Sequence, residues 1–480
     1  MNHYQESFRP SEKISRRTFM RRAAARCAGR GAAAAAIFTI IPRSVLGGSG
    51  HISPSSTLNI AGIGIGGVGK AFLQGCAGQQ GVNILALCDV DDRYAAPVFA
   101  TYPKAARYRD FREMLESEKG IDAVMVATPD HSHAVISSKA IKMDKNVLCV
   151  KPLTRTIYES RMIAEAARKA KVATQVTASS SASDSACTLC EMIWDGAIGP
   201  VREVHCWSNR PLWPQGMTRP DGQDQVPAHL DWDLWIGPAP MRPFKASWPK
   251  EHLALEQVSS GRPPDAVYHP WNFRGWWDFG TGALGDMGCH HFNTVCRALK
   301  LGHPTSVEAT STKVFAETAP LASVVTWDFP ARADMPALKL FWYDGGLKPP
   351  RPAELEDGRP MPAEGNLYVA DKGKILGGTN DGRIIPASKM QQYKLPPQTL
   401  RRPAFGESLT TAEWTAACRG GEPASCNFDV ADLLTEVVLL GNIAIRTGKK
   451  LYWDGDNMKI TNDEGANEYI RQPYRSGWSL

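Results

Sequence analysis

The stretch LNIAGIGIGGVG at residues 58–69 decides the fold. Its apolar first half predicts a short buried strand, and the glycines that follow fit the pattern G-x-G-x-x-G at the start of a helical run. In that pattern the first glycine makes a tight turn, the second lets the backbone approach a pyrophosphate, and the third lets helix and strand pack closely. The phosphates would lie on free N–H groups at the helix N-terminus. The residues that we predict to bind a dinucleotide in this loop are Gly64, Gly66, Gly67, Val68 and Gly69.

Strand and helix patterns alternate from this loop to about residue 177. A second apolar strand at 83–88 ends in Asp89, 20 residues beyond Gly69, where a dinucleotide fold places the acid that binds ribose hydroxyls. Alternation of this kind predicts a parallel, doubly wound sheet. Because ligands of such sheets bind beyond the carboxyl ends of the strands, TPDHSH at 128–133 and Lys151 should line the same site as the glycine loop.

The pattern changes after residue 178. A small, polar stretch at 179–186 predicts a hinge between domains, and a tract rich in tryptophan and proline follows at 211–279. Ordered loops of that length are usually functional. The further elements that we expect are a helix near 184–194, strands near 201–207, 304–315, 322–328 and 337–343, a hairpin at 367–376 and an apolar helix at 428–447. The predicted domains are therefore 57–178, which binds the dinucleotide, and 179–480.

The formal charge of +6 is concentrated at the N-terminus. Residues 1–50 carry nine Lys and Arg against two Glu, which gives +7, so the rest of the chain has 46 basic against 47 acidic side chains, or −1. A body without a basic surplus gives no reason to expect a nucleic-acid partner. The run SRRTFM at 15–20 resembles a twin-arginine export signal, and the apolar stretch at 31–41 is too short to predict a membrane span. We therefore expect a periplasmic protein, with 1–50 as signal and tail.

The eleven cysteines are scattered along the chain. Cys88 and Cys149 lie in apolar, strand-like runs, and Cys187 and Cys190 form a C-x-x-C in an expected helix with no second pair nearby. We interpret them as buried thiols, with zinc or redox use of the C-x-x-C as the alternative.

Two groups of residues suit proton transfer. Lys151 stands at a strand end, before a proline that disfavours helix there. In DFGTGALGDMGCHHFN at 278–293, Asp286 and His290 are four residues apart and project from one face of a predicted helix. A carboxylate beside an imidazole fixes its tautomer and can raise its basicity. The alternatives are a structural Asp–His pair and a metal site completed by a distant histidine, although we predict no metal.

In their order along the chain, the glycine loop, Asp89, TPDHSH, VKP at 150–152 and the D-x-x-x-H run resemble the Gfo/Idh/MocA family, the group of glucose–fructose oxidoreductase and inositol dehydrogenase. The resemblance covers about residues 57–480, and the ending KITNDEGANEYIRQPYRSGW is similar to the exported members. It implies a Rossmann domain followed by a C-terminal α/β domain on a large open, mostly antiparallel sheet. It also implies hydride chemistry with NAD or NADP on a sugar, polyol or glycoside, and a homo-oligomer.

Individual site residues follow from the resemblance. Lys151 matches the lysine of the family's E-K-P element, although Val150 replaces the glutamate, and Asp286 and His290 match the catalytic D-x-x-x-H pair. Asp89 matches a residue that favours NAD, because its carboxylate would repel a 2′-phosphate. The cofactor-lining T-P-x-x-x-H segment is matched by Thr128, Pro129 and His133. Arg93 lies close to Asp89 in the sequence and leaves NADP open as the alternative cofactor.

These roles lead to an expected mechanism in which NAD⁺ takes a hydride from a secondary carbinol. His290 would accept the hydroxyl proton, Asp286 would orient its ring, and Lys151 would hydrogen-bond the same oxygen. Aromatic faces suit the apolar side of a sugar ring, and an arginine can bind hydroxyls or an acidic group. The expected substrate contacts are Tyr268, His269, Trp271, Arg274 and Trp277.

Three functions stay open at this point. The first is a sugar or polyol oxidoreductase with a retained cofactor, because free NAD is expected to be scarce outside the cytoplasm. The second is an NAD-dependent glycosidase or lyase of the α-N-acetylgalactosaminidase type, which oxidises the sugar at C3, eliminates the aglycone and then restores the cofactor. It needs a second base, for which Tyr268 and His269 are candidates. The third is a sugar- or nucleotide-binding module without catalysis, which the intact Lys151, Asp286 and His290 disfavour.

Overall fold

The structure, a computed structural model of the 480-residue chain, describes residues 57–257, 265–403 and 409–480. Residues 56–480 form one compact unit. The predicted export signal and tail at 1–50 lie outside the described residues. In the described ranges, no helix is both long and apolar enough to cross a membrane.

The first half of this unit is a six-stranded, entirely parallel sheet. Its strands are β1 (Leu58–Ile63), β2 (Val82–Cys88), β3 (Ala106–Tyr108), β4 (Ala123–Val126), β5 (Asn146–Cys149) and β6 (Thr174–Val176). They lie in the order β3-β2-β1-β4-β5-β6. The central strands read as continuous apolar runs because helices cover both faces of the sheet. The order reverses between β1 and β4, which opens a crevice at their carboxyl ends.

Helices join these parallel strands. They are α3 (Gly69–Ala77), α4 (Asp92–Thr101), α5 (Phe111–Ser117), α6 (His133–Lys142) and α7 (Ile157–Ala170). Several begin at a side chain that accepts a hydrogen bond from a free backbone N–H. Asp91 caps α4 through the N–H of Tyr94, and Thr156 with Glu159 forms a capping box on α7. Such caps fix where each helix starts relative to the strand end before it.

A nine-stranded mixed sheet forms the second half. Its strands are β7 (Val201–Trp207), β8 (Ser306–Ser311), β9 (Ser323–Phe329), β10 (Leu338–Tyr343), β11 (Gly365–Ala370), β12 (Gly373–Gly377), β13 (Arg383–Ile385), β14 (Leu451–Asp454) and β15 (Lys459–Ile460). The order is β13-β12-β11-β7-β10-β9-β8-β14-β15, and every neighbouring pair is antiparallel except β7 with β10. The predicted fold class, a Rossmann domain followed by a mostly antiparallel sheet, is confirmed.

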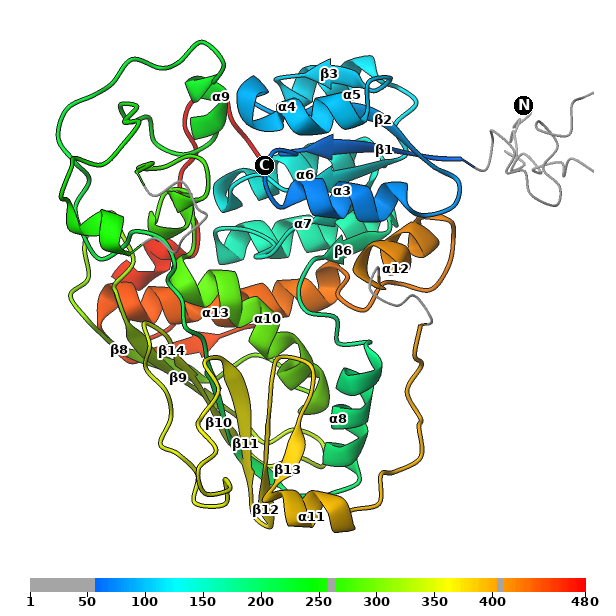
Figure 1. Cartoon of the computed structure of the whole chain (residues 1–480), viewed down its shortest axis with the longest axis vertical. Helices are drawn as coiled ribbons and strands as arrows, with labels where there is room; N and C mark the ends of the chain where they lie inside the picture. Colours follow the sequence, from blue (N-terminus) through cyan, green and yellow to red (C-terminus); the bar gives the residue numbers. More distant parts are fainter. Residues whose placement is uncertain (1–56, 258–264, 404–408) are drawn as a thin grey trace, which may run out of the picture. The chain divides into compact units, whose positions relative to one another are not determined.

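Two long helices pack on the mixed sheet, on the side that faces the Rossmann half. Helix α13 (Phe428–Thr447) packs on β8 and β9 and also on α7, while α10 (Gly282–Ala298) packs on α13, on β7 and on α8 (Asp184–Trp194) (Figure 1). Helix α13 is apolar over most of its surface because it lies between the two halves. Helix α11 (Ala387–Gln392) follows β13, and α12 (Leu409–Cys418) packs against α3 and β6.

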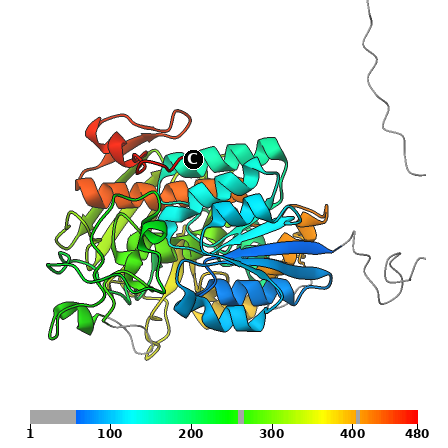
Figure 2. The same ribbon diagram turned by 90° about the horizontal axis from the view of Figure 1, so that it is seen from above.

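The tryptophan-rich tract folds without joining either sheet. It holds α9 (Trp232–Ile236) and the short 3-10 turns η3 (Leu253–Glu256) and η4 (Asn272–Gly275). It has its own apolar cluster, whose large members include Trp232, Trp235, Trp248, Tyr268, Trp276 and Phe279. Backbone bonds tie it to the Rossmann edge, with Asp231 N to Val90 O at 2.9 Å and Asp92 N to His229 O at 3.0 Å. The tract, green in Figures 1 and 2, therefore lies at the carboxyl ends of the parallel strands.

Candidate active site

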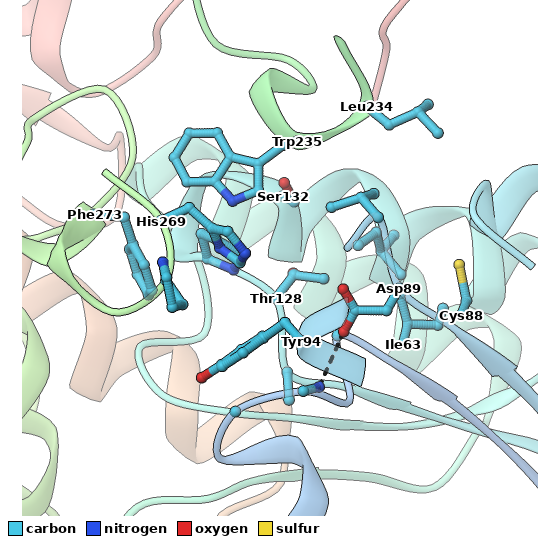
Figure 3. Close-up of a pocket in the computed structure, with 18 of the residues that line it drawn as sticks. Ile63, Cys88, Asp89, Tyr94, Thr128, Ser132, Leu234, Trp235, His269 and Phe273 are labelled. Atoms are coloured by element: carbon cyan, nitrogen blue, oxygen red, sulfur yellow. Dashed lines mark hydrogen bonds between the residues drawn. The ribbon is translucent and has the colours of Figure 1, made fainter. Parts of the chain in front are cut away.

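A pocket lies between the carboxyl ends of the parallel strands and the tryptophan-rich tract. The Rossmann side contributes the glycine loop, Asp89, the segment 128–130 and Lys151, and the tract contributes the opposite wall. Figure 3 shows Tyr94, His269 and Trp235 gathered around the space beside Thr128. The pocket is thus at the strand-order reversal where open α/β sheets bind ligands.

Two glycines of the loop, Gly64 and Gly69, have no room for a side chain. Gly64 has φ +75°, and a Cβ there would lie 2.6 Å from the backbone nitrogen of Thr128. A Cβ on Gly69 would lie 2.3 Å from the carbonyl oxygen of Gly64, because α3 passes directly against the turn. The hydroxyl of Thr128 is buried at the pocket and has no partner in the described residues. A close backbone cradle with an unused hydroxyl fits a dinucleotide.

Asp89 is buried beside this loop, and both of its carboxylate oxygens accept backbone hydrogen bonds. Gly66 N donates to Oδ2 at 3.0 Å (dashed in Figure 3), and Asp91 N donates to Oδ1 at 3.1 Å. Burial raises the pKa of Asp89 above its usual range, although these bonds and His269 oppose the rise. The carboxylate retains lone pairs for ribose hydroxyls. Arg93 is exposed and does not line the pocket.

His133 is fully buried behind the pocket and does not line it. Its ring nitrogens lie 2.8 Å from the carbonyl oxygens of Pro152 and of Thr128. The predicted cofactor contact is therefore corrected: His133 holds the Thr128 turn against the Lys151–Pro152 turn. Thr128 and Pro129 themselves line the pocket.

Lys151 reaches Asp286 across the boundary between the two halves. Its Nζ contacts the Asp286 carboxylate and donates to the Asp286 carbonyl oxygen at 2.8 Å. Arg274 Nε donates to the same carboxylate oxygen at 3.1 Å. Burial alone would raise the pKa of Asp286, but the cations of Lys151 and Arg274 hold it well below its usual range. One carboxylate therefore positions two cations, both of which line the pocket.

His290 does not contact Asp286 in the way that the sequence predicts. Its Nδ1 accepts a hydrogen bond from the backbone N–H of Ser179 at 3.1 Å, so in the neutral ring Nε2 carries the proton. Burial, followed by the nearby charge of Lys151, lowers the pKa of His290 to about 3. Asp286 pairs with Lys151 and Arg274 instead, because charged side chains bind a buried carboxylate more strongly than a neutral imidazole does. His290 does not line the pocket, and its free nitrogen is a donor.

The predicted substrate contacts divide into two sets. His269, Trp271 and Arg274 line the pocket. His269 Nε2 lies 3.0 Å from Asp91 Oδ2, and the Arg274 guanidinium lies 4.1 Å from the Trp271 ring centre. The prediction is wrong for Tyr268 and Trp277: the first is buried in the apolar cluster of the tract, and the second lines a different cavity. Neighbours in sequence point to opposite sides of the irregular tract, which spacing alone does not reveal.

Comparison with family models matches two regions of the chain. Residues 58–178 match the Gfo/Idh/MocA model described as an oxidoreductase family, NAD-binding Rossmann fold, and residues 371–480 match the model of its C-terminal alpha/beta domain. These two regions are therefore similar to the two domains of the Gfo/Idh/MocA oxidoreductases. Residues 58–178 form an NAD-binding Rossmann domain, which confirms the predicted cofactor.

Curated proteins similar to part of this chain are inositol 2-dehydrogenases. That of Arthrobacter sp. (strain FB24) is 30% identical over 166 residues, which are 34% of this chain and 49% of the relative. That of Pseudarthrobacter chlorophenolicus is 35% identical over 113 residues, 23% of this chain and 33% of the relative. The matched stretches thus span a third to a half of the relatives' length.

Solved structures share the fold over most of this chain. The WlbA dehydrogenase of Bordetella pertussis, in complex with NADH and UDP-GlcNAcA, is 15% identical with a TM-score of 0.56 and covers 83% of this chain and 99% of its own. The aldose-aldose oxidoreductase of Caulobacter crescentus, complexed with glycerol, is 16% identical with a TM-score of 0.53, over 83% and 100%.

Sequence reasoning missed several aromatic residues of this pocket, and three of them come from separate segments. Trp235 lines it from α9, Tyr94 from the first turn of α4, and Trp478 from the C-terminal segment. The Arg112 guanidinium lies 4.7 Å from the Trp478 ring centre, which fastens that segment to α5. One signal for Tyr94 was available in the sequence. Asp91, two residues after Asp89, predicts the start of a helix, and a helix that begins there turns Tyr94 toward the glycine loop.

Within the described ranges, no group of three or more His, Cys, Asp or Glu side chains is arranged to hold a metal ion. Cys187 and Cys190 are buried, unpaired thiols in α8. Burial raises the pKa of the Cys190 thiol to about 12, which makes it a poor nucleophile and a poor ligand at neutral pH.

Proposed function

We propose that this protein is an NAD-dependent oxidoreductase that transfers a hydride between a hydroxyl-bearing carbon of a sugar or polyol and nicotinamide. One observation carries the proposal: Lys151, held by buried Asp286 and beside Arg274, lines the same pocket as the glycine loop of an NAD-binding domain. A binding module has no need for a cation that a buried carboxylate positions in this way.

Proton transfer in this pocket falls to Lys151. The nicotinamide ring, when bound, supplies the hydride acceptor. Loss of hydride from a carbinol leaves a carbonyl only if the hydroxyl proton also leaves, and Lys151 is assigned as the acceptor of that proton. The Asp286 carboxylate then stabilises the ammonium that forms, and this ammonium returns the proton in the reverse direction. Positioned proton transfer contributes about 10²–10⁴-fold. Asp286 and Arg274 hold the amine in place, and the protonated Nε2 of His290 can only donate, so the base is assigned to Lys151 in place of His290.

The pocket walls suit a polyhydroxylated substrate. Trp271 offers an apolar face, and Arg274 and His269 offer donors beside it. Aromatic faces bind the apolar side of a sugar ring while charged donors bind its hydroxyls. This combination, together with inositol 2-dehydrogenases among the relatives, supports a sugar or polyol as the substrate class.

Release of bound cofactor and absorbance at 340 nm test the proposal. Purified protein is denatured, the released nucleotide is identified, and native protein is assayed with a panel of free sugars, polyols and aryl glycosides. A sugar-dependent rise at 340 nm supports the oxidoreductase. Aglycone release without a lasting rise would replace it by the glycosidase or lyase, and no released nucleotide and no activity with added NAD⁺ would leave only a binding module.

Export through the twin-arginine route is a further part of the proposal and is supported by SRRTFM at 15–20. Cell fractionation tests it: the protein should be periplasmic, and a variant with Arg16→Lys and Arg17→Lys should stay in the cytoplasm. We also propose a homo-oligomer, for which light scattering of the purified protein gives the mass directly; a mass of one chain would contradict it.

A further inference from the structure

The C-terminal segment, residues 470–480, returns to the Rossmann half of the molecule. It is drawn in red in Figure 1, where it runs beside α9 toward the carboxyl ends of the parallel strands. Trp478 of this segment is partly exposed and lines the active-site pocket. An aromatic side chain that is remote from the glycine loop in the sequence therefore forms part of the same pocket.

The strand ends give the direction in which a dinucleotide lies in this pocket. The glycine loop follows β1, Asp89 follows β2, and the edge strand β3 lies on the other side of β2. The loop receives the pyrophosphate, and the acid at the end of the second strand binds the ribose of the adenosine half. The adenine base is bonded to that ribose, so it belongs beyond Asp89, beside the end of β3.

Trp478 lies at this adenine end of the pocket. Residues 109–111, which follow β3, line the pocket there, and the ring centres of Phe111 and Trp478 are 6.2 Å apart. The tip of the indole is also close to the turn after β4, because a Cβ added to Gly237 would lie 3.8 Å from Trp478 Cη2 and 3.3 Å from Ser132 Oγ. The indole is thus near both segments between which the base is expected.

Arg475 ties the C-terminal segment to α9. Its Nε donates to the carbonyl oxygen of Gly237 at 3.0 Å, and its Nη2 donates to the carbonyl oxygen of Asp233 at 3.0 Å. The backbone N–H of Trp478 donates in turn to the carbonyl oxygen of Arg475 at 3.2 Å. Residues near the end of a domain are usually poorly ordered unless they are tied down in this way. The indole is therefore held in place before a ligand binds, which lowers the entropic cost of a contact.

We propose that Trp478 contacts the adenine base of bound NAD, so that the C-terminal segment helps to hold the cofactor. An indole offers a flat π-face, and a purine base binds to such a face without needing a particular hydrogen-bond partner. The inference rests on the NAD-binding Rossmann domain and is independent of the reaction proposed for the pocket.

Competition against radiolabelled NAD⁺ on the purified full chain tests this contact. ADP-ribose contains the adenine, whereas nicotinamide mononucleotide contains only the other half of the cofactor. Trp478→Ala should raise the dissociation constant of ADP-ribose by about five- to a hundredfold, the range for loss of one base–aromatic contact. It should change the dissociation constant of the mononucleotide by less than about twofold, because that half lies away from Trp478. An unchanged constant for ADP-ribose would overturn the proposal, and so would an equal loss for both ligands, since Trp478 would then only support the fold.

Two further variants separate contact with the base from general packing. Trp478→Phe keeps an aromatic face and should retain most of the affinity for ADP-ribose. Trp194→Ala is the matched control, because Trp194 is 38% exposed and lies in α8, away from the pocket, and it should leave both constants unchanged. A selective loss of ADP-ribose affinity in Trp194→Ala as large as in Trp478→Ala would contradict the assignment.

Photolabelling locates the contact without a substitution. The azide of 8-azido-ADP-ribose is on the base, so it attaches to residues beside the adenine when it is irradiated. Trypsin cleaves after Arg475, and we expect label on the peptide 476–480, which carries Trp478, and its loss when unlabelled NAD⁺ is present. Displaceable label on other peptides alone would overturn the proposal.

Discussion

The amine of Lys151 contacts the carboxylate of Asp286, and the same carboxylate also pairs with Arg274. The D-x-x-x-H spacing correctly places Asp286 and His290 on one helix, α10, but spacing within a helix does not say which partner comes from another segment. Lys151 arrives from the end of β5 and Arg274 from η4, so the pairing depends on tertiary structure. This is why the role of the base moves from His290 to Lys151.

Replacement of Lys151 tests that role. Lys151→Met should lower kcat by about 10²–10⁴-fold, because it removes the group assigned as the proton acceptor. NAD binding should change little, as measured by calorimetry, since the glycine loop is untouched. His290→Asn is the comparison: it should lower kcat less than Lys151→Met, and the reverse order would return the role of base to His290.

Loss of Asp286 should cost the protein stability. Asp286→Asn leaves Lys151 and Arg274 buried, at 14% and 13% side-chain exposure, without their shared counter-charge. Removal of one partner from a buried ion pair destabilises by about 3–5 kcal/mol. Denaturant unfolding measures the loss, and Asp371→Asn, which breaks an exposed pair with Arg202, should cost less than about 1 kcal/mol.

The lowered pKa of Asp286 also predicts a pH dependence. A carboxylate with a depressed pKa in the folded state stabilises the protein above its unfolded pKa of about 3.9. That contribution is lost as the pH falls below this value and through the folded pKa. The difference in unfolding free energy between wild type and Asp286→Asn should therefore shrink on acidification below about pH 4; a constant difference would contradict the assigned cause.

At the scale of elements, periodicity predicted the long or strongly patterned segments. The helices at 184–194 and 428–447 and the strand at 201–207 match α8, α13 and β7. Short elements such as β3, which has three residues, were missed. Three residues are too few to show an alternation of apolar and polar side chains. Helix α4 was missed as well, since Pro97 interrupts its pattern.

The turn between β1 and α3 gives an element-scale prediction. Gly69→Ala places a Cβ 2.3 Å from the Gly64 carbonyl oxygen, a backbone atom that cannot move without opening the turn. We expect a loss of about 1–3 kcal/mol in unfolding free energy and a drop in NAD affinity of roughly tenfold or more. Gly302→Ala is the control, because nothing lies within 4 Å of its added Cβ. Equal behaviour of the two variants would mean that this turn does not form the cofactor cradle.

At the scale of the molecule, the order of strands could not be predicted from the sequence alone. The nine-stranded sheet pairs β7 with β10 in parallel and brings β14 beside β8, across more than a hundred residues. The pocket also depends on contacts between segments that are far apart in the sequence. Its walls come from the Rossmann edge, the tryptophan-rich tract and, through Trp478, the C-terminal segment. The motif residues of the glycine loop and Asp89 lie on the Rossmann wall, while residues such as Trp235 and Trp478 reach the pocket through packing that has no local signature in the sequence.

We propose that hydride from a sugar or polyol carbon reaches nicotinamide in this pocket with Lys151 as the proton acceptor. Transfer of an isotope label from substrate to cofactor tests this proposal. Purified protein with NAD⁺ is mixed with carbon-deuterated glucose, inositol and glycerol in single turnover, and the released nucleotide is analysed by mass spectrometry. We predict deuterium in the nicotinamide of the reduced cofactor, sampled before it is re-oxidised, for at least one of these compounds with the wild type, and a loss of about 10²-fold or more in the rate of labelling with Lys151→Met. Unlabelled nicotinamide with every compound, or equal labelling rates in the wild type and Lys151→Met, would contradict the account.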